Sequence, residues 1–471
     1  MSQKKISRRD FNKTAAGIAI GSAMLSIGSK KILGANDRIN LATIGFRGQG
    51  GAHIRDFSGI PDVHYNTICD VDENLFAESI KYLEENHGYK PKTEWDLRKV
   101  YDDKDIDAVT IATPNHWHAL ATIWACQAGK HVYVEKPSCH NIWEGRKMVE
   151  AARKYDVCVQ VGFQNRSRKN TRAAIQFIHD GKLGQVYMAR GLCFKWRYDI
   201  GKYPDGPMVK GETFSLTKDA TSNMPAYTEE YLKKVHYDLW MGPAKELPFN
   251  RNRFHYNWHW QWEYGNGDTG NQGPHQFDVA NWGLNKQEYP VKVSSRGGNF
   301  VFDSAQNTPN TQTTVLEYAD GSILEFATRG LITNAEGEQK IGVIFYGSEG
   351  WLEIDAEGNW KTFFGRNGEP GPTSEQIEEE ESDASVLVGT GAGGHYGNFI
   401  YAVKNNDQNA LTCDVEVGHE SSCLAHMGNI AYRVGWDLKF DGRKEQFVDD
   451  DVANELLMRD YRYPYVVPEK V

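Results

Sequence analysis

The chain has 471 residues, more than the ~250 to 300 at which a single hydrophobic core stops growing, so we expect two domains. Its net charge of -10 argues against nucleic-acid binding, which needs a basic face to displace counterions from phosphates. The seven cysteines have no C-x-x-C spacing, which argues against a cysteine metal site and a disulfide framework.

The chain begins with a pattern typical of twin-arginine export signals. Ser7 to Lys13 match S-R-R-x-F-x-K. The apolar run from Ala15 to Ile27 is shorter than the ~20 residues that span a bilayer, so it is typical of a signal h-region. We therefore expect residues 1–35 to be a cleaved signal, and the mature chain to be periplasmic and free of the membrane. The alternative is a chance arginine pair before a core helix.

A glycine-rich turn follows the first predicted strand, Ile39 to Ile44, and leads into a helical stretch. Gly45 and Gly50 hold the first and third positions of a G-x-G-x-x-G pattern, and Arg47 occupies the second. A strand, a glycine turn and a helix start place backbone N–H groups where a pyrophosphate binds. The alternative is a purely structural glycine turn.

An acidic residue ends the next predicted strand, Val63 to Cys69. Asp70 comes twenty residues after Gly50, where a carboxylate hydrogen-bonds the ribose hydroxyls of a dinucleotide. Because a carboxylate repels a 2′-phosphate, the sequence predicts NAD rather than NADP as the cofactor.

Three further strands alternate with helices before residue 165. They are predicted at Ala108 to Thr113, His131 to Val134 and Val157 to Gly162. Five strand–helix alternations indicate a parallel, doubly wound sheet, in which ligands bind at the carboxyl ends of the strands. Asn115 and His118 follow one of these ends, and Glu135 and Lys136 follow another.

After Gln185 the pattern changes to paired strands. The two predicted hairpins join Thr313–Tyr318 to Ser322–Thr328 and Ile341–Tyr346 to Trp351–Asp355. They indicate an open antiparallel sheet. We expect a polar surface loop over the acidic run from Gly365 to Gly394, and a helix over Gly418 to Gly435 that returns to the first domain.

The order of the glycine turn, Asp70, Thr113-Pro114-Asn115 and Glu135-Lys136-Pro137 resembles the Gfo/Idh/MocA oxidoreductases over essentially the whole mature chain. The resemblance implies an α/β fold: an N-terminal doubly wound Rossmann domain and a C-terminal α+β domain with a large open, mainly antiparallel sheet. It also implies a homo-oligomer, a dimer or a tetramer. The expected segments are a signal at 1–35, an NAD-binding domain at 36–163, a substrate and oligomerisation domain at 164–440 and an extension at 441–471.

The resemblance assigns cofactor contacts to Thr113, Asn115, His118, Glu135 and Lys136. It places Glu135 and Lys136 beside the nicotinamide ribose, with Lys136 reaching the reacting hydroxyl. The alternative for Lys136 is an ordinary solvated lysine after a strand.

A second family-like segment lies between the halves. Its matching positions are Gly265, Gly267, Asn271, Gly273, His275 and Asp278. His275 is the expected base, and a hydrogen-bonded core histidine is the alternative. If the segment opens a helix, Asn271 and His275 point to one face. Asn271 stands where many family dehydrogenases carry an aspartate, which removes a charge that would raise the histidine pKa. Asp268 could compensate from the preceding turn, and Asp278 could orient His275 from the same helix.

The remaining site predictions concern the substrate. By resemblance, Gln164 and Arg166 approach it, and tryptophans provide walls for stacking on a sugar or simply fill the core. The expected substrate residues are Gln164, Arg166, Trp196, Trp262 and Asp268. His259, Glu263 and His275 suggest a metal alternative, but they have no local metal-binding frame.

Three functions are therefore considered, all with a small carbohydrate as ligand. The first is an NAD-dependent oxidoreductase acting on a hydroxyl of a sugar, polyol or glycoside. The second is a lyase or hydrolase that keeps its NAD and cleaves glycosides by transient oxidation and elimination; poor access to free NAD outside the cytoplasm favours it. The third is a non-catalytic sugar-binding protein. The intact Glu135-Lys136-Pro137 triplet favours the first.

Overall fold

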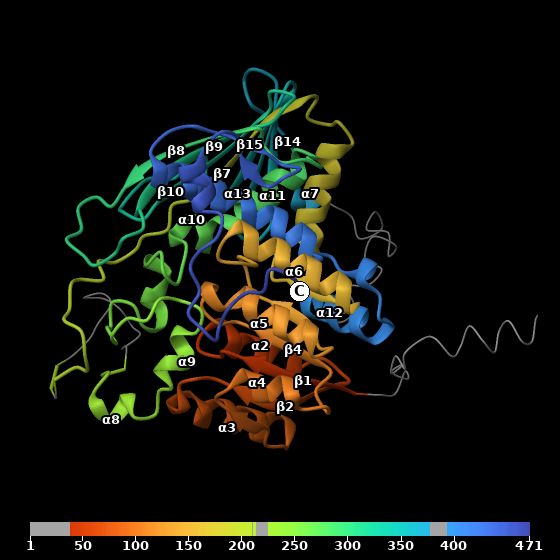
Figure 1. The fold of residues 1–471 in the computed structure, drawn as a ribbon. Helices are drawn as coiled ribbons and strands as arrows, with labels where there is room; N and C mark the ends of the chain where they lie inside the picture. The colour runs from red at the N-terminus through yellow and green to blue at the C-terminus, as the bar shows by residue number, and fades with distance from the viewer. Residues whose placement is uncertain (1–37, 210, 213–224, 377–392) are drawn as a thin grey trace, which may run out of the picture. The chain divides into compact units, whose positions relative to one another are not determined.

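The computed structural model describes residues 38–209, 211–212, 225–376 and 393–471. The predicted signal at 1–35 lies outside the described residues, as does most of the acidic run after residue 376. The described chain contains a six-stranded sheet and a ten-stranded sheet (Figure 1).

The six-stranded sheet is entirely parallel, with the order β3-β2-β1-β4-β5-β6. Its strands are β1 (Ile39–Ile44), β2 (Val63–Cys69), β3 (Lys92–Glu94), β4 (Ala108–Ile111), β5 (His131–Val134) and β6 (Val159–Val161). The Rossmann prediction is confirmed. The additional strand β3 was not predicted, because its three polar residues carry no apolar pattern. The strand order reverses between β1 and β4, which opens a crevice at the carboxyl ends.

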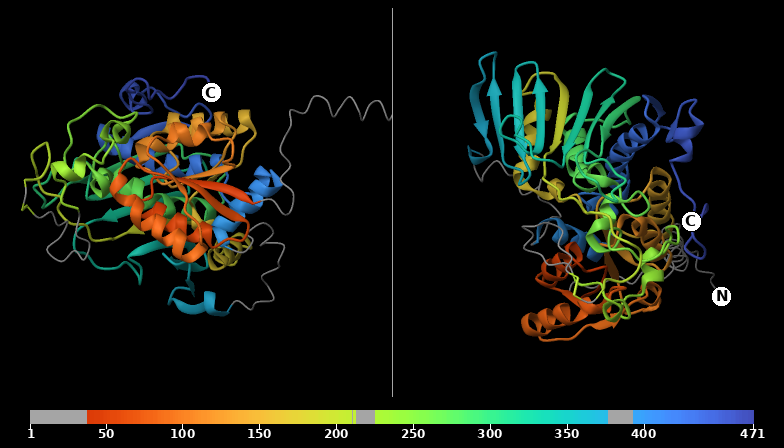
Figure 2. Two further views of the ribbon diagram at one scale, coloured as in Figure 1. Left: turned by 90° about the horizontal axis from the view of Figure 1, so that it is seen from below. Right: turned by 90° about the vertical axis from the view of Figure 1, so that its left-hand side faces the viewer.

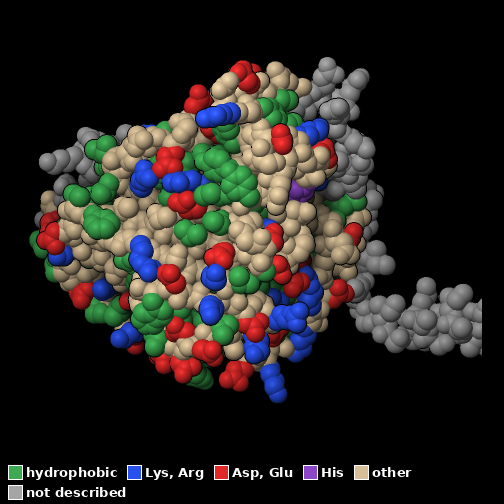
Figure 3. All heavy atoms as spheres, turned by 90° about the horizontal axis from the view of Figure 1, so that it is seen from above, with side chains coloured by type: hydrophobic (Ala, Val, Ile, Leu, Met, Phe, Trp, Pro, Cys, Tyr) green, Lys and Arg blue, Asp and Glu red, His purple; other side chains and the backbone are tan. Residues whose placement is uncertain are grey.

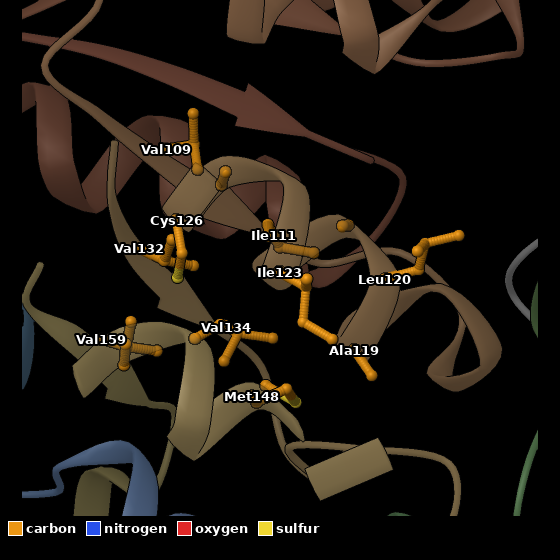
Figure 4. Close-up of a cluster of buried hydrophobic side chains, with 14 of the residues drawn as sticks. Val109, Ile111, Ala119, Leu120, Ile123, Cys126, Val132, Val134, Met148 and Val159 are labelled. Carbon is orange, nitrogen blue, oxygen red and sulfur yellow. The ribbon is translucent and has the colours of Figure 1, made fainter. Parts of the chain in front are cut away.

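Helices cover this sheet. They are α2 (Gln49–Ser58), α3 (Phe76–His87), α4 (Leu97–Asp102), α5 (Asn115–Gln127) and α6 (Ile142–Tyr155). Helix α5 is buried almost throughout, because it lies between the sheet and α6. Figure 4 shows Ile123 of α5 and Met148 of α6 beside Ile111 and Val134 of the neighbouring strands, all part of one core.

The ten-stranded sheet has the order β14-β13-β12-β11-β7-β10-β9-β8-β15-β16. Its strands are β7 (Val186–Cys193), β8 (Lys292–Gly298), β9 (Thr311–Glu317), β10 (Ile323–Arg329), β11 (Ile341–Gly347), β12 (Gly350–Asp355), β13 (Trp360–Phe364), β14 (Glu369–Thr373), β15 (Leu438–Asp441) and β16 (Gln446–Phe447). All described pairs are antiparallel except β7 with β10.

Both predicted hairpins are present, as the pairs β9–β10 and β11–β12. Gly321 takes a φ of 84° in the first turn, which favours glycine. The expected loop after Gly365 differs in part, because Glu369–Thr373 forms strand β14. This strand contains Pro370 and Pro372, and it lies at the sheet edge, where a strand tolerates proline.

Helices α7 (Lys169–His179), α11 (Gly273–Gly283) and α13 (Val415–Val434) pack on one face of the large sheet (Figure 2). Ala189 and Phe345 belong to the core on that face. Leu192 and Ile344 belong to a separate small apolar cluster, as the alternation of side chains along strands requires. Helix α13 also packs against α6 and β6, so the predicted return to the first domain is confirmed.

An insertion between β7 and α10 (Gly267–Asn271) packs against the carboxyl ends of the parallel strands. It includes α8 (Glu229–Leu232), α9 (Tyr237–Met241) and the turn η3 (His255–Trp260). Asp72 is fully buried and anchors it: the carboxylate lies 2.8 Å from Nε2 of His255 and accepts a 2.5 Å hydrogen bond from the Tyr231 hydroxyl. The insertion is therefore fixed directly beside Asp70.

The remaining described helices are α12 (Gly394–Asn405), which packs on α2, and α14 (Asp451–Glu455), which packs on α13. None of the described helices is long and apolar enough to span a bilayer. On the face shown in Figure 3, acidic and basic side chains are interspersed around a group of apolar ones, so that face presents no continuous basic surface.

Candidate active site

The glycine turn forms one wall of a cavity of about 350 Å³ at the carboxyl edge of the parallel sheet. A Cβ on Gly50 would lie 1.9 Å from the Gly45 carbonyl oxygen, and one on Gly45 would lie 3.0 Å from the Thr113 nitrogen. These close approaches explain both glycines. Helix α2 begins at Gln49, and Gly48 before it provides no side-chain cap, so the first N–H groups of the helix are available to a phosphate. Arg47 lines the same cavity.

Asp70 lies at the predicted end of β2 and also lines the cavity. Its carboxylate accepts hydrogen bonds from the backbone N–H of Phe46 at 2.8 Å and of Asp72 at 3.0 Å. Burial raises the pKa of Asp70 to about 6, although these two hydrogen bonds act in the opposite direction. The carboxylate is thus held in place by the backbone of the glycine turn.

Apart from Gly50, which packs against the Gly45 carbonyl, the predicted cofactor residues come together in this cavity. Those that line it are Gly45, Arg47, Asp70, Thr113, Asn115, His118, Glu135 and Lys136. Within the described part of the chain, the buried Thr113 Oγ1 and Asn115 Oδ1 have no hydrogen-bond partner. Unsatisfied polar atoms, a glycine cradle and an uncapped helix start fit a bound dinucleotide.

Lys136 lies at the boundary between this cavity and a second one of about 250 Å³. Its ammonium donates to the carbonyl oxygen of Asn271 at 2.9 Å and to Oδ1 of the same residue at 3.4 Å. Asn271 ends α10, so the lysine satisfies a carbonyl that the helix leaves free. Burial lowers the pKa of Lys136, and the Glu135 charge opposes this shift.

Glu135 is buried beside Lys136 and remains ionised. Its Oε1 lies 3.0 Å from Nε2 of His53 and accepts a 3.2 Å hydrogen bond from Gln164. Burial alone would raise the pKa of Glu135, but the hydrogen bond and charge of His53 and the charge of Lys136 lower it to about 2. The site therefore keeps a negative charge next to the lysine.

His275 lines the second cavity together with Gln164, Asn165 and Gln272. Its ring meets Phe163 edge to face, with 6.1 Å between ring centroids. Burial and then the charge of Lys136 lower the pKa of His275 to about 3, so the ring is neutral at neutral pH. A neutral imidazole is the form that accepts a proton.

The expected common helix face of Asn271 and His275 is not found. Helix α10 ends at Asn271 and α11 begins at Gly273, so a break separates the two residues. Asn271 lines the first cavity and His275 the second. The four-residue spacing was misleading because it places two side chains on one face only within a continuous helix.

Among the described residues, neither Asp268 nor Asp278 forms a hydrogen bond or an ion pair with His275. Asp268 forms a buried bidentate ion pair with Arg197, with a shortest distance of 2.5 Å. Asp278 pairs with Arg166 at 2.7 Å and accepts a 2.6 Å hydrogen bond from Ser421. Both carboxylates are therefore engaged with arginines, and neither the compensation by Asp268 nor the orientation of His275 by Asp278 has a hydrogen bond to support it among the described residues.

Of the five predicted substrate residues, the structure brings only Gln164 to the cavities that Lys136 borders. Arg166 and Asp268 are held in the ion pairs above, and Trp196 is 52% exposed. Trp262 lines a different depression with Arg433. The placement of these four residues does not support a contact with the substrate. That contact stays a prediction.

Residues 39–163 match the profile of the oxidoreductase family with an NAD-binding Rossmann fold, and residues 217–339 and 391–467 match that family's C-terminal alpha/beta domain. The chain belongs to the Gfo/Idh/MocA family of oxidoreductases. The predicted NAD-binding domain is confirmed.

Among relatives of this Gfo/Idh/MocA chain, a levoglucosan dehydrogenase of Pseudarthrobacter phenanthrenivorans is 30% identical over 179 residues, which are 36% of this chain and 44% of the relative. A glycosyl hydrolase family 109 protein of Shewanella pealeana is 28% identical over 204 residues, 39% of this chain and 44% of the relative. Both matches thus span less than half of the relative.

The same fold occurs in the crystal structure of the WlbA dehydrogenase from Chromobacterium violaceum in complex with NADH and UDP-GlcNAcA. That structure is 18% identical, has a TM-score of 0.59, and is aligned over 86% of this chain and 97% of its own. This likeness establishes the fold alone.

The sequence analysis missed several residues that line the cavities of this family member. They are Gln49, Trp95, Arg168, His255, Tyr256, Gln272 and Tyr396. Tyr256, Trp258 and His259 come from the insertion, where an unusual density of aromatic residues was the available signal. His259 and His275 lie in different cavities, and no group of three metal-ligating side chains occurs in the described ranges.

Proposed function

We propose that this chain is an NAD-dependent oxidoreductase that acts on a hydroxyl group of a sugar, polyol or glycoside. The observation that carries the proposal is the position of Lys136, a buried amine bordering both the cavity with the dinucleotide-binding groups and a second, polar cavity. A lysine held at such a boundary reaches a substrate oxygen next to a cofactor. The name of the levoglucosan dehydrogenase relative supports a sugar-type substrate.

The second cavity has the side chains that a polyhydroxylated ligand requires. Gln164, Asn165, Gln272 and Gln276 contribute amides, which both donate to and accept from hydroxyl groups. Oε1 of Gln276 is buried and lacks a hydrogen-bond partner in the described structure. Amides pair with hydroxyl groups as donors and as acceptors, which suits a hydroxyl-rich molecule.

The residues of the chain have distinct tasks in this reaction. Bound NAD supplies the hydride acceptor. Lys136 directs N–H groups that are not used by Asn271 toward the substrate oxygen and stabilises negative charge on it. The sequence motif predicts His275 as the proton acceptor; its neutral ring is able to accept a proton, but no hydrogen bond from the described residues orients that ring.

The test uses protein purified without added cofactor. Mass analysis identifies the bound nucleotide, and a panel of sugars, polyols and glycosides is then added while NADH absorbance and aglycone release are both recorded. NADH without aglycone is the expected result. Failure to form NADH with every compound, together with absence of aglycone, would refute the proposal.

Redox-neutral glycoside cleavage is the second candidate. Leu239, Trp240, Tyr256 and Trp258 of the insertion contribute to the wall of the NAD-binding cavity, and Asp72 anchors this insertion. A cofactor covered in this way exchanges slowly, which suits a cycle that regenerates NAD in place. The name of the glycosyl hydrolase family 109 relative also favours it. Aglycone release without net NADH in the same assay would establish this candidate.

We also propose export through the twin-arginine pathway, based on Arg8 and Arg9 and the short apolar run that follows. Replacing both arginines with lysine should retain the protein in the cytoplasm. The amount of this variant in the periplasmic fraction is measured by cell fractionation and immunoblotting. An amount equal to that of the wild type would contradict this proposal.

Finally, we propose a homo-oligomer that uses the face of the large sheet opposite α11 and α13. This face carries an apolar cluster that includes Leu192, Phe194 and Ile344, with Tyr346 and Trp351 packed against it. Light scattering of the purified protein should give at least twice the chain mass. A monomeric mass at micromolar concentration would count against it.

A further inference from the structure

His259 lies in the wall of the NAD-binding cavity. It comes from the turn η3, and it lines the same cavity as Lys136 and Asn271. Tyr256 and Trp258 of the same turn also line this cavity. The insertion therefore brings a histidine to one of the two cavities that Lys136 borders, and His275 lines the other.

The ring of His259 is held in one tautomer and one orientation. Its Nδ1 lies 2.6 Å from the carbonyl oxygen of Tyr256. Because a carbonyl oxygen only accepts, Nδ1 carries the proton and Nε2 carries the lone pair. The indole of Trp258 stacks on the ring with 3.6 Å between centroids and an interplanar angle of 20°. A base oriented by a neighbouring group is the usual arrangement in proton-transfer sites.

The other two histidines that line this cavity are used by the fold. Both ring nitrogens of His118 face backbone carbonyls, at 2.7 Å and 2.8 Å. Nε2 of His255 lies 2.8 Å from the Asp72 carboxylate. For Nε2 of His259, by contrast, the described residues provide no hydrogen-bond partner. Its lone pair is therefore available to a molecule bound in the cavity.

Burial and the nearby positive charges keep His259 neutral. Burial lowers its pKa to about 3; the Tyr256 carbonyl opposes this shift, and the positive charges of Lys136 and Arg197 add to it. His275 is also neutral, but no hydrogen bond within the described chain orients its ring. In addition, Asn271 provides no carboxylate to support His275. The geometry therefore favours His259 as the oriented base.

We propose that His259 is a further catalytic residue, with Nε2 as the acceptor of the substrate hydroxyl proton. This inference rests on the proposed oxidoreductase function. The C–H hydrogen leaves with its electron pair to NAD, the O–H bond breaks with its proton going to Nε2, and the O–H electron pair forms the carbon–oxygen double bond. The products are a carbonyl compound, NADH and an imidazolium. A weak base suffices, because the hydroxyl becomes strongly acidic as the hydride leaves.

The division of tasks follows from the positions. Lys136, held by the Asn271 carbonyl, donates a hydrogen bond to the reacting oxygen, and His259 takes the proton from that oxygen. His275 then lines the polar cavity that receives the rest of the substrate. In this arrangement the asparagine at position 271 is compatible with catalysis, because the base is on the insertion.

The test compares His259→Gln, His275→Gln and His179→Gln. A glutamine at position 259 can still donate to the Tyr256 carbonyl, but it cannot accept a proton. His179 is the control, because it is exposed on α7 and its Nε2 also lies near a carbonyl, that of Trp282 at 2.9 Å. Single-turnover reduction of bound NAD should fall on the order of a hundredfold or more in His259→Gln, with KM and NAD content nearly unchanged. The His275→Gln rate should fall by less than about tenfold, and the control should be unaffected.

A His259→Gln variant with a wild-type rate, with only a raised KM, or with NAD lost on purification would overturn the inference. Nitrogen-15 imidazole spectra of the NAD-loaded protein give a second measurement that does not depend on a known substrate. They should show His259 neutral with the proton on Nδ1, and a proton on Nε2 would refute the inference. If the wild-type protein forms NADH with none of the sugars in the panel, the proposed function itself is refuted. If the wild type is active and the His259→Gln variant has the same rate, only the role of His259 is refuted.

Discussion

Replacing Lys136 with methionine tests the central feature of the site, because methionine keeps the unbranched chain as far as the Cε position and removes the N–H groups. If Lys136 supplies a positioned donor to the reacting oxygen, its loss should slow the chemical step by on the order of a hundredfold or more, the usual effect of such a group. A hundredfold loss corresponds to about 2.7 kcal/mol of activation free energy.

The effect on stability should be smaller, because two contributions oppose each other. The variant loses the hydrogen bond to the Asn271 carbonyl and leaves that carbonyl unpaired, which costs about 1 to 3 kcal/mol. It also removes a buried amine whose desolvation already lowers its pKa. We therefore expect the free energy of unfolding to fall by less than about 2 kcal/mol.

The assay measures single-turnover reduction of bound NAD by a saturating substrate from the panel, with NAD content and urea unfolding recorded on the same samples. Lys81→Met is the matched control, because Lys81 is exposed on α3 and pairs only weakly with Glu85, at 3.8 Å. A Lys136→Met rate within tenfold of wild type, with NAD retained, would refute the assigned role of the lysine.

Three further predictions follow from the cofactor cavity. The pKa of Glu135 lies at about 2 instead of 4.5, so its ionised form contributes about 3 kcal/mol of stability above pH 4.5 that is lost as the pH falls toward 2. The difference in unfolding free energy between wild type and Glu135→Gln should therefore shrink over this range, and a constant difference would contradict the pKa. Asp70→Asn keeps an oxygen for the Phe46 N–H but removes the charge that repels a 2′-phosphate, so the preference for NAD over NADP in equilibrium binding should fall roughly tenfold or more; an unchanged preference would show that another group discriminates. Gly50→Ala places a Cβ 1.9 Å from a backbone oxygen, so NAD binding should weaken at least about tenfold with the circular dichroism spectrum retained, and normal binding would mean that the turn adjusts.

Several features of this protein follow from short stretches of sequence. The strands β1, β2, β4 and β5 appear as short apolar runs, and the glycine turn and Asp70 follow from their position after such strands. The hairpin at Asp320-Gly321 is equally local. These features were predictable because backbone sterics and the burial of both faces of a parallel sheet act within a few residues.

The composition of the candidate site depended on tertiary structure. Arg166 meets Asp278 across 112 residues, and Arg197 meets Asp268 across 71, so these charges are paired and do not face a substrate. No local pattern shows which of two carboxylates a distant arginine will neutralise. The sequence therefore placed Asp268 and Arg166 in a substrate site from which their ion pairs withdraw them.

The positions of the histidines show the same limit. The sequence identified His275 from its motif, but it could not show that the helix breaks after Asn271, nor that Lys136 binds the carbonyl exposed there. It contained His259 without indicating that the insertion, anchored on Asp72, would bring that ring to the NAD-binding cavity. Local sequence determined the binding edge of the sheet, because strand ends and glycine turns are fixed by nearby residues. Only the tertiary structure decided which side chains meet at Lys136, because those contacts depend on the long-range packing of the insertion and α10.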